Sequence, residues 1–321
     1  MKICIFGAGA IGGNLAVRLA SGGADVAVVA RGEHLAAIRQ NGMTLELPDR
    51  TINQRVTASA DPRELGPQDF VIVTVKAPAL KDVAAGIGPL LKADTPVMFV
   101  MNGIPWWYFY KHGGAFDGRR LPLIDPGDAV WNAVGPERAV GAVIYSANSV
   151  PRPGVVRNIG GNARLVIGEP DGEMSTRTKA IADALIAGGA TTDVTPRIRE
   201  FVWTKLLANM SSNPLTFLGL CPIGEVIGSP VLLDALKTMS KEVVAIAGAL
   251  GYDVSLDIEK AFATGGVHKP SIVQDLERGK PLELDSMFTV PVEFGKLFNV
   301  PTPMLDLMVT LMKLRARAAG L

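Results

Sequence analysis

The sequence predicts an α/β protein in which a Rossmann-type, mostly parallel sheet is followed by an all-helical C-terminal domain. Up to about Pro196, short apolar runs alternate with helical segments, as a parallel sheet with crossover helices requires. After Pro196, the remaining segments show a hydrophobic period of about 3.6 residues, which is typical of packed helices. We therefore expect two domains, an α/β domain over residues 1–196 and an all-helical domain over residues 197–321.

Short apolar runs mark the predicted strands: residues 2–6, 25–30, 70–75, 97–101, 139–146, 154–158, 164–167 and 190–194. Residues 148–161, with two prolines and three glycines, predict an antiparallel edge instead of a crossover. A turn is expected over residues 168–172 and a helix over residues 174–187. Helices of the second domain are expected over residues 198–212, 230–250, 256–264, 271–278, 283–298 and 302–319.

A glycine-rich loop follows the first strand directly and opens an amphipathic helix. In that context the pattern G-x-G-x-x-G is typical of dinucleotide binding. Gly7 permits the tight turn, Gly9 lets the backbone approach the pyrophosphate, and Gly12 allows close packing of helix and strand. A purely structural glycine turn is the alternative. The predicted cofactor-binding loop consists of Gly7, Ala8, Gly9, Ala10, Ile11 and Gly12.

Arg31 directly follows the second predicted strand, at the position where NAD-binding proteins usually carry Asp or Glu for the ribose hydroxyls. A carboxylate would repel a 2′-phosphate, whereas a guanidinium binds it with paired hydrogen bonds. The residue type therefore favours NADP(H) over NAD(H), with a solvated loop arginine as the alternative.

Two further polar residues follow buried strands. Lys76 comes after residues 70–75, and Asn102, with Gly103, comes after residues 97–101. Ligands of open parallel sheets bind at the carboxyl ends of the strands, so both side chains are candidates for the cofactor crevice. A solvated lysine and an Asn-Gly turn are the alternatives.

Lys205, Asn209 and Asn213 are spaced four residues apart in an otherwise apolar run. On a helix of about 3.6 residues per turn they project as one narrow stripe. Buried polar groups are costly unless something binds them, so the stripe can offer one proton donor and two carboxamides to a small polar ligand. Satisfaction of the stripe by loop carbonyls is the alternative.

Composition excludes several classes of function. The chain has 321 residues, 48% of them hydrophobic and 20% charged, and a net charge of +1, so we expect no nucleic-acid partner. No apolar stretch reaches the roughly 18 residues of a membrane span, and the first strand leaves no room for a signal peptide. Cys4 and Cys221 give no metal spacing or disulfide framework, and His34, His112 and His268 are scattered. We therefore expect a cytoplasmic protein with no metal site and no membrane association.

Together these features resemble the ketopantoate reductase (2-dehydropantoate 2-reductase) family over nearly the whole chain. The segments that carry the resemblance are residues 7–12, Arg31, residues 69–76, Asn102 with Gly103, and residues 205–209, 213–216, 269–275 and 283–285. The last two are the most specific, because a Pro-Ser helix start followed twelve residues later by Glu283 is not a general Rossmann feature.

The resemblance implies NADPH-dependent reduction of a 2-keto acid, with the substrate held over the nicotinamide between the two domains. Residues 1–196 would then be the NADP-binding domain and residues 197–321 the substrate and catalytic domain. It implies that Lys205 is the general acid and that Glu283 engages the cofactor or Lys205 and favours the charged amine. The implied substrate contacts are Asn102, Asn209, Asn213 and Ser271. The implied cofactor contacts beyond the glycine loop are Arg31, Lys76, Asn102, Glu283 and a residue near Ala147.

The chain departs from the family pattern at two places. Ile223 stands where some members carry an asparagine, which leaves the identity of the keto acid open. Trp106 and Trp107 begin an aromatic stretch that could line a pocket, form a subunit contact or simply pack. Ser271 also suits an N-terminal helix cap.

The first expectation is reduction of 2-dehydropantoate to pantoate, in the biosynthesis of pantothenate. The alternative is a related NADP(H)-dependent 2-keto acid reductase or 2-hydroxyacid dehydrogenase. A dehydrogenase of the 6-phosphogluconate type is disfavoured because no phosphate-binding cluster lies near Lys205. A non-catalytic NADP(H)-binding regulator is disfavoured because Lys205 and Glu283 are both present. A homodimer is compatible with the sequence, which leaves the oligomeric state, the direction of flux and domain closure open.

Overall fold

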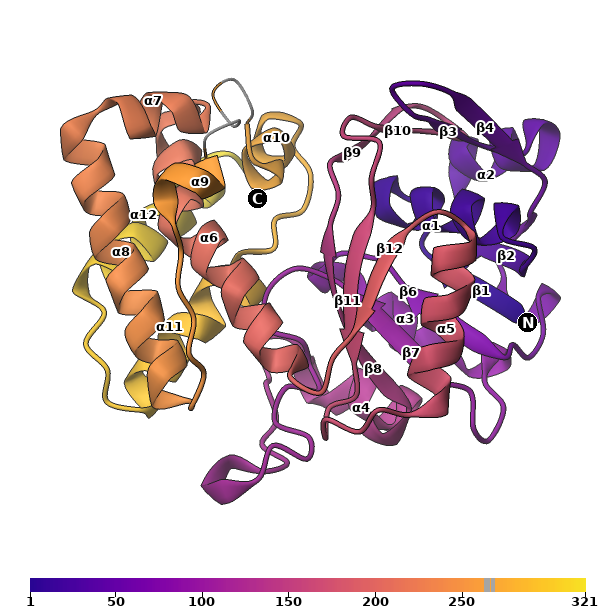
Figure 1. Ribbon diagram of the computed structural model, residues 1–321, viewed down its shortest axis with the longest axis horizontal. Coiled ribbons are helices and arrows are strands. Elements are labelled where there is room, and N and C mark those ends of the chain that lie inside the picture. The colour runs from indigo at the N-terminus through magenta and orange to yellow at the C-terminus, as the bar shows by residue number, and fades with distance from the viewer. Residues whose placement is uncertain (263–265, 267–268) are drawn as a thin grey trace. The chain divides into compact units, whose positions relative to one another are not determined.

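The computed structural model describes residues 1–262, 266 and 269–321. The end of the helix expected over residues 256–264, and His268, lie outside the described residues. The chain divides into two compact units (Figure 1). The first comprises Met1–Met101 and Pro105–Ile198, and the second comprises Asn102–Ile104 and Arg199–Leu321. The expected domain boundary after residue 196 stays a prediction, and the assignment of Asn102–Ile104 to the second unit was not foreseen.

The first unit is built on an eight-stranded sheet with the order β12-β11-β8-β7-β6-β1-β2-β5. Its strands pair in parallel except for β8 with β11, so the predicted mostly parallel Rossmann-type sheet is confirmed. The strands are β1 (Lys2–Phe6), β2 (Asp25–Val29), β5 (Thr57–Ser59), β6 (Phe70–Val73), β7 (Val97–Val100), β8 (Ala139–Tyr145), β11 (Arg164–Gly168) and β12 (Thr191–Val194).

Continuous apolar runs form the central strands because helices cover the sheet. All four residues of β6 and of β7 are buried, as expected for parallel strands buried on both faces. The helices of this unit are α1 (Ala10–Ser21), α2 (Gly32–Asn41), α3 (Leu80–Gly86), α4 (Ala129–Val134) and α5 (Thr176–Ala187).

A second, four-stranded sheet has the order β4-β3-β10-β9. Its strands are β3 (Met43–Glu46), β4 (Thr51–Gln54), β9 (Asn148–Arg152) and β10 (Val155–Asn158). The antiparallel pairing predicted over residues 148–161 is confirmed, with β9 pairing antiparallel to β10. These strands belong to the second sheet, however, and not to the main one as expected. The sequence did not reveal β3, β4 and β5, because each is at most four residues long and only partly buried.

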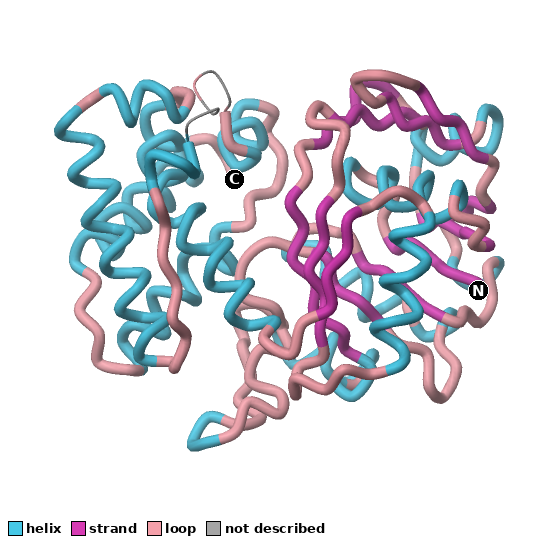
Figure 2. The backbone as a smooth tube through the Cα atoms, viewed as in Figure 1, coloured by secondary structure: helices cyan, strands magenta, loops and turns pink. Residues whose placement is uncertain are grey.

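Among the described residues, strands occur only in the first unit, and the second unit is helical (Figure 2). Its elements are α6 (Ile198–Gly219), α7 (Ile223–Gly228), α8 (Pro230–Ala249), α9 (Ile258–Phe262), α10 (Ser271–Glu277), a π-helix η7 (Asp285–Thr289), α11 (Val290–Leu297) and α12 (Pro303–Ala318).

The predicted end of α6 at residue 212 was wrong. The helix continues through Pro214 to Gly219, with Met210 and Phe217 fully buried on either side of the proline. Proline removes one helical hydrogen bond, but the buried side chains on both sides hold the helix together across that gap. The missed helix α7 has only six residues, too few for a periodic signal.

The aromatic stretch after β7 belongs to the core of the first unit. Trp106 and Trp107 are each 1% exposed, and Trp106 packs edge-on against Phe99 and Trp131 at centroid distances of 5.3 and 5.8 Å. Such edge-to-face contacts are favourable arrangements of aromatic rings. Of the three interpretations of this stretch, packing is therefore the one that the structure bears out.

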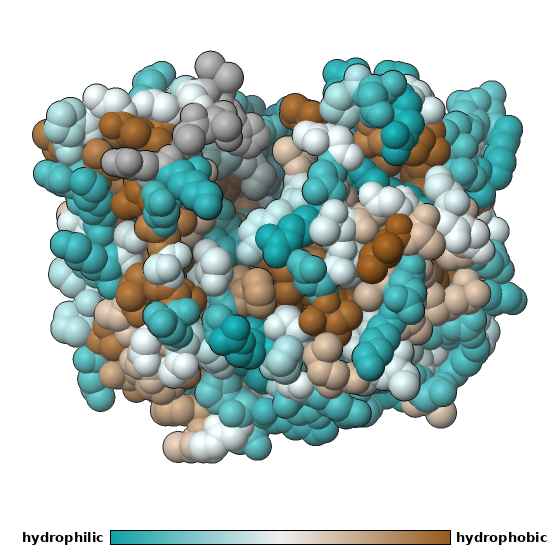
Figure 3. Space-filling model, in the orientation of Figure 1, coloured by the Kyte–Doolittle hydropathy of each residue, from teal (hydrophilic) through white to brown (hydrophobic). Residues whose placement is uncertain are grey.

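Hydrophilic and hydrophobic residues are interspersed over the face shown in Figure 3. Within the described ranges, the helices are too short or too polar for any of them to cross a membrane.

Candidate active site

The glycine-rich loop lies at the carboxyl end of β1, where two of its glycines are sterically required. Gly7 has a φ of +103°, a conformation that L side chains rarely adopt. A Cβ on Gly12 would lie 2.0 Å from the carbonyl oxygen of Gly7 and 2.4 Å from Oγ1 of Thr74. Helix and strand therefore approach so closely at Gly12 that no larger residue fits.

Gly9 has the opposite property, because a Cβ added there would meet no atom within 4 Å. It occupies the N-cap position of α1 with no side-chain cap, and the first turn of this helix contains no acidic residue. The N-terminal end of α1 therefore has free space beside it, and no acidic side chain in the first turn offsets its positive partial charge. This geometry fits the pyrophosphate of a dinucleotide.

Arg31 and Lys76 follow the two strands that flank β1 in the sheet, β2 and β6. Arg31 follows β2 as the N-cap of α2, and its largely exposed guanidinium lies 3.1 Å from Oδ2 of Asp82 on α3. Lys76 follows β6 and caps the short 3-10 helix over Ala77–Ala79. Ala147 is exposed between β8 and β9. These residues and the glycine loop all belong to the first unit.

The polar stripe of α6 is present as predicted from its four-residue spacing. Lys205 and Asn209 are partly buried, and Asn213 is 4% exposed, with its Oδ1 accepting a hydrogen bond from the Ser212 hydroxyl at 3.3 Å. Burial lowers the pKa of Lys205 from 10.5 to about 8, against the attraction of the Glu283 carboxylate, which raises it. Lys205 is therefore a stronger acid than an ordinary lysine, and its amine is still mostly charged at pH 7.

Asn102 and Glu283 are brought together from distant parts of the sequence. The Asn102 Nδ2 donates to Oε2 of Glu283 at 3.2 Å, and Glu283 is 9% exposed. Gly103 and Ile104, which follow Asn102, hold this contact in place. A Cβ on Gly103 would lie 2.3 Å from the backbone of Ser286, and the Ile104 N–H donates to the Ser286 carbonyl at 2.8 Å. Asn102, Lys205 and Glu283 thus form one polar group in the second unit.

Ser271 lies at the start of α10, but not as its cap. Pro270 is the N-cap, and Ser271 is the first helical residue, with an exposed side chain. The cap alternative was therefore wrong. Gln274 instead secures this end of the helix by donating from Nε2 to the carbonyl of Lys269 at 2.9 Å.

Sequence reasoning did not single out Thr74, Asp82 and Ser286. The Thr74 Oγ1 donates to the Gly7 carbonyl at 2.5 Å and thereby locks the turn. The only signal for Thr74 was a hydroxyl at the end of an apolar run. Asp82 pairs with Arg31, and the Ser286 carbonyl accepts from the Ile104 N–H. These partners are far apart in the sequence, so no local pattern indicates them.

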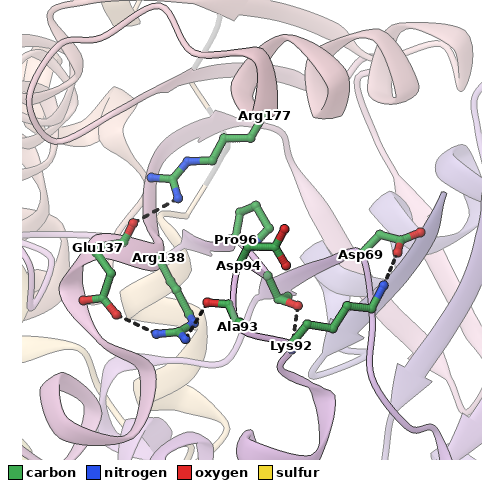
Figure 4. Close-up of a pocket in the computed structure, with 9 residues that line it drawn as sticks. Asp69, Lys92, Ala93, Asp94, Pro96, Glu137, Arg138 and Arg177 are labelled. Carbon is green, nitrogen blue, oxygen red and sulfur yellow. Dashed lines mark hydrogen bonds and ion pairs between the residues drawn. The ribbon is translucent and has the colours of Figure 1, made fainter.

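A separate hollow of ≈ 580 Å³ lies at the amino-terminal ends of the central strands β6, β7 and β8 (Figure 4). Its cations are held in short ion pairs: Lys92 with Asp69, Arg138 with Glu137, and Arg177 with Glu169. The charges of this hollow are therefore compensated within the protein. It contains none of the residues predicted to bind cofactor or substrate. In the described part of the chain, no group of three His, Cys, Asp or Glu side chains could hold a metal ion.

Comparison with known proteins identifies the family of the chain. The family described as ketopantoate reductase PanE/ApbA matches residues 3–172, and its C-terminal domain matches residues 197–316. A 2-dehydropantoate 2-reductase of Mesorhizobium japonicum is 40% identical over 100% of this chain and 99% of its own length. One from Pyrococcus horikoshii is 27% identical over the same shares of the two chains.

Solved structures are similar over the full chain as well. A PanE/ApbA family ketopantoate reductase from Ralstonia eutropha superposes with a TM-score of 0.84, at 26% identity and with all of both chains covered. D-mandelate dehydrogenase in complex with NADH and anilino(oxo)acetate has the same fold, with a TM-score of 0.83 at 21% identity and full coverage of both chains. Two matched domains and a 40% identical relative over the whole chain show that this protein belongs to the ketopantoate reductase PanE/ApbA family of oxidoreductases.

Proposed function

We propose that this protein reduces 2-dehydropantoate to pantoate with NADPH, a step in the biosynthesis of pantothenate. The observation that carries the proposal is the group formed by Asn102, Lys205 and Glu283, which places an amine with a pKa of about 8 beside a carboxylate and a carboxamide. The 40% identity to a 2-dehydropantoate 2-reductase over the whole chain supports the choice of substrate.

The glycine loop would hold the pyrophosphate of the cofactor, because Gly9 and the start of α1 leave room for an anion. A nicotinamide dinucleotide is the cofactor class of this reductase family, and NADH is bound in a neighbour of the same fold. The choice of NADPH rests on Arg31, whose exposed guanidinium suits a 2′-phosphate. Lys76 is proposed to assist from the end of β6, and the segment around Ala147 to contribute a further contact. When bound, the reduced nicotinamide supplies the hydride.

Lys205 is proposed to supply the proton. Its ammonium donates a hydrogen bond to the keto oxygen of the substrate, stabilises the negative charge that develops there, and then transfers its proton. With a pKa of about 8, roughly nine tenths of the amine is charged at pH 7. The amine is therefore both present in the acid form and a stronger acid than an ordinary lysine.

The remaining residues would orient the substrate and Lys205. Glu283 keeps the amine charged, and Asn102 holds the Glu283 carboxylate in place at 3.2 Å. Asn209, Asn213 and Ser271 are proposed to bind the carboxylate and hydroxyl of the substrate with uncharged donors.

A panel of 2-keto acids tests the substrate assignment. NADPH oxidation is followed by absorbance with 2-dehydropantoate, with smaller aliphatic 2-keto acids and with aromatic ones. The proposal predicts the highest kcat/KM for 2-dehydropantoate. A higher value for another 2-keto acid would favour the alternative, a related reductase in which the buried, apolar Ile223 reshapes the substrate site.

A cytoplasmic location and a homodimeric state remain predictions, which fractionation and analytical ultracentrifugation would check.

A further inference from the structure

His34 connects three segments of the first unit that are far apart in the sequence. It is partly buried in the first turn of α2, three positions after Arg31. Its Nε2 lies 2.7 Å from the carbonyl oxygen of Ala8 in the glycine loop. Its Nδ1 lies 3.0 Å from the backbone nitrogen of Gly154, in the turn between β9 and β10. The ring therefore joins the glycine loop, the segment that carries Arg31, and the second sheet.

The two partners assign the tautomer of the ring. The carbonyl of Ala8 can only accept a hydrogen bond, so Nε2 of His34 carries the proton. The N–H of Gly154 can only donate, so Nδ1 is unprotonated. Each nitrogen of the ring therefore has a backbone partner, and the two bonds together fix the orientation of the ring.

The bond to Ala8 completes a pattern in the glycine loop. Three consecutive carbonyl oxygens accept hydrogen bonds from the protein: that of Gly7 from Thr74 Oγ1 at 2.5 Å, that of Ala8 from His34, and that of Gly9 from the N–H of Gly13 at 2.7 Å. Carbonyl oxygens carry partial negative charge and would repel a pyrophosphate, whereas helix N–H groups attract it. Holding all three oxygens on protein donors prepares the loop for an anion.

The middle carbonyl is the one most dependent on a side chain that can move. Thr74 directly follows β6, and its own N–H is held by the Phe6 carbonyl at 3.1 Å, while the Gly13 N–H belongs to α1 itself. The His34 donor depends on one side chain, which the Gly154 N–H orients from behind. Gly154 is tied in turn, because its carbonyl accepts from the Thr44 N–H of β3 at 2.9 Å.

We propose that His34 is a positioning residue for the dinucleotide. It holds the Ala8 carbonyl away from the pyrophosphate and fixes the glycine loop relative to Arg31. The inference rests on the proposed use of a dinucleotide cofactor, and it adds a residue that does not itself touch the cofactor. A loop held in its binding conformation before the ligand arrives loses less conformational entropy on binding.

Two isosteric variants separate the two hydrogen bonds. The amide nitrogen of His34→Gln can take the place of Nε2 and keep the bond to Ala8. The amide oxygen of His34→Asn can take the place of Nδ1 and keep only the bond from Gly154. His34→Ala removes both bonds, and His112→Asn serves as a control on a histidine whose own ring bonds the carbonyl of Gly113.

The experiment titrates each full-length variant with NADPH by calorimetry and measures kcat at saturating NADPH. We expect His34→Asn and His34→Ala to bind NADPH about 5- to 10-fold more weakly, the size of effect that one net hydrogen bond supplies. His34→Gln and His112→Asn should stay within about twofold of the wild type, and kcat should be unchanged throughout. Thermal unfolding identifies any variant that fails to fold, and the Gln and Asn variants then carry the test.

Equal NADPH affinity in all folded variants would overturn the inference while leaving the proposed function intact. A loss in His34→Gln with none in His34→Asn would also overturn it, because the bond from Gly154 would then be the one that matters. A wild-type protein that binds no NADPH would overturn the proposed function and this inference together.

Discussion

Reduction should slow as the pH rises through about 8, because the proton donor is lost there. With the pKa of Lys205 at about 8, the charged fraction falls from roughly 0.9 at pH 7 to roughly 0.1 at pH 9. At its ordinary pKa of 10.5, the same lysine would lose only a few per cent of its charge over that range. The lowered pKa therefore predicts about a tenfold fall of kcat/KM between pH 7 and pH 9.

Glu283→Gln tests the origin of that pKa. The carboxylate raises the pKa of Lys205 against the effect of burial, so its removal should lower the pKa further. A nearby opposite charge typically shifts a pKa by about 1–3 units, so the falling limb should move about one pH unit or more toward acid. The glutamine oxygen can still accept from Asn102, which preserves the local packing.

The assay is the initial rate of NADPH oxidation at low 2-dehydropantoate concentration, measured from pH 6 to pH 10 with saturating NADPH. The profile of kcat/KM reports the ionisation of the form that has not yet bound the substrate. Asp285→Asn is the matched control, because Asp285 is an exposed carboxylate two residues from Glu283 and should leave the limb in place. A wild-type profile that stays flat to pH 10, or an equal shift in both variants, would refute the reasoning.

Three further substitutions probe the cofactor site of the first unit. Arg31→Ala should weaken NADPH far more than NADH in binding titrations, because only NADPH carries the 2′-phosphate; equal losses for the two would remove that role. Gly12→Ala should lower stability by about 1–3 kcal/mol in chemical unfolding, since its Cβ would lie 2.0 Å from the Gly7 carbonyl oxygen. Gly9→Ala meets no atom within 4 Å, so it should unfold like the wild type yet bind NADPH more weakly. A stable Gly12→Ala variant with normal NADPH affinity would contradict the packing argument.

Sequence patterns predicted the parallel sheet well because its signals are local. The run over β6 is buried at every position, and the glycine loop follows β1 without interruption. The polar stripe of α6 could be predicted for the same reason, since four-residue spacing has only one geometric meaning on a helix. By contrast, β3 and β4 have only four residues each. β3 alternates between buried and partly exposed positions, and β4 exposes every second residue. Short strands of that kind take their pairing from the tertiary structure.

The candidate site shows the same division. Gly7 and Gly12 could be predicted because their steric roles lie within one motif. The bond between Asn102 and Glu283 spans 181 positions and depends on Gly103 packing against Ser286, which no local pattern encodes. The strand-end position had already indicated Asn102, and the resemblance to a known family supplied Glu283. The structure supplied the reason why a glycine follows Asn102, since Gly103 packs against Ser286.

Lys205→Ala provides the most direct test of the central claim, that this amine donates the proton in an NADPH-dependent reduction. The variant and the wild type are compared with 2-dehydropantoate at pH 7, with NADPH affinity measured separately by calorimetry. The account predicts a fall in kcat of about 10²–10⁴-fold with NADPH affinity largely retained. A variant that turns over at the wild-type rate would contradict it.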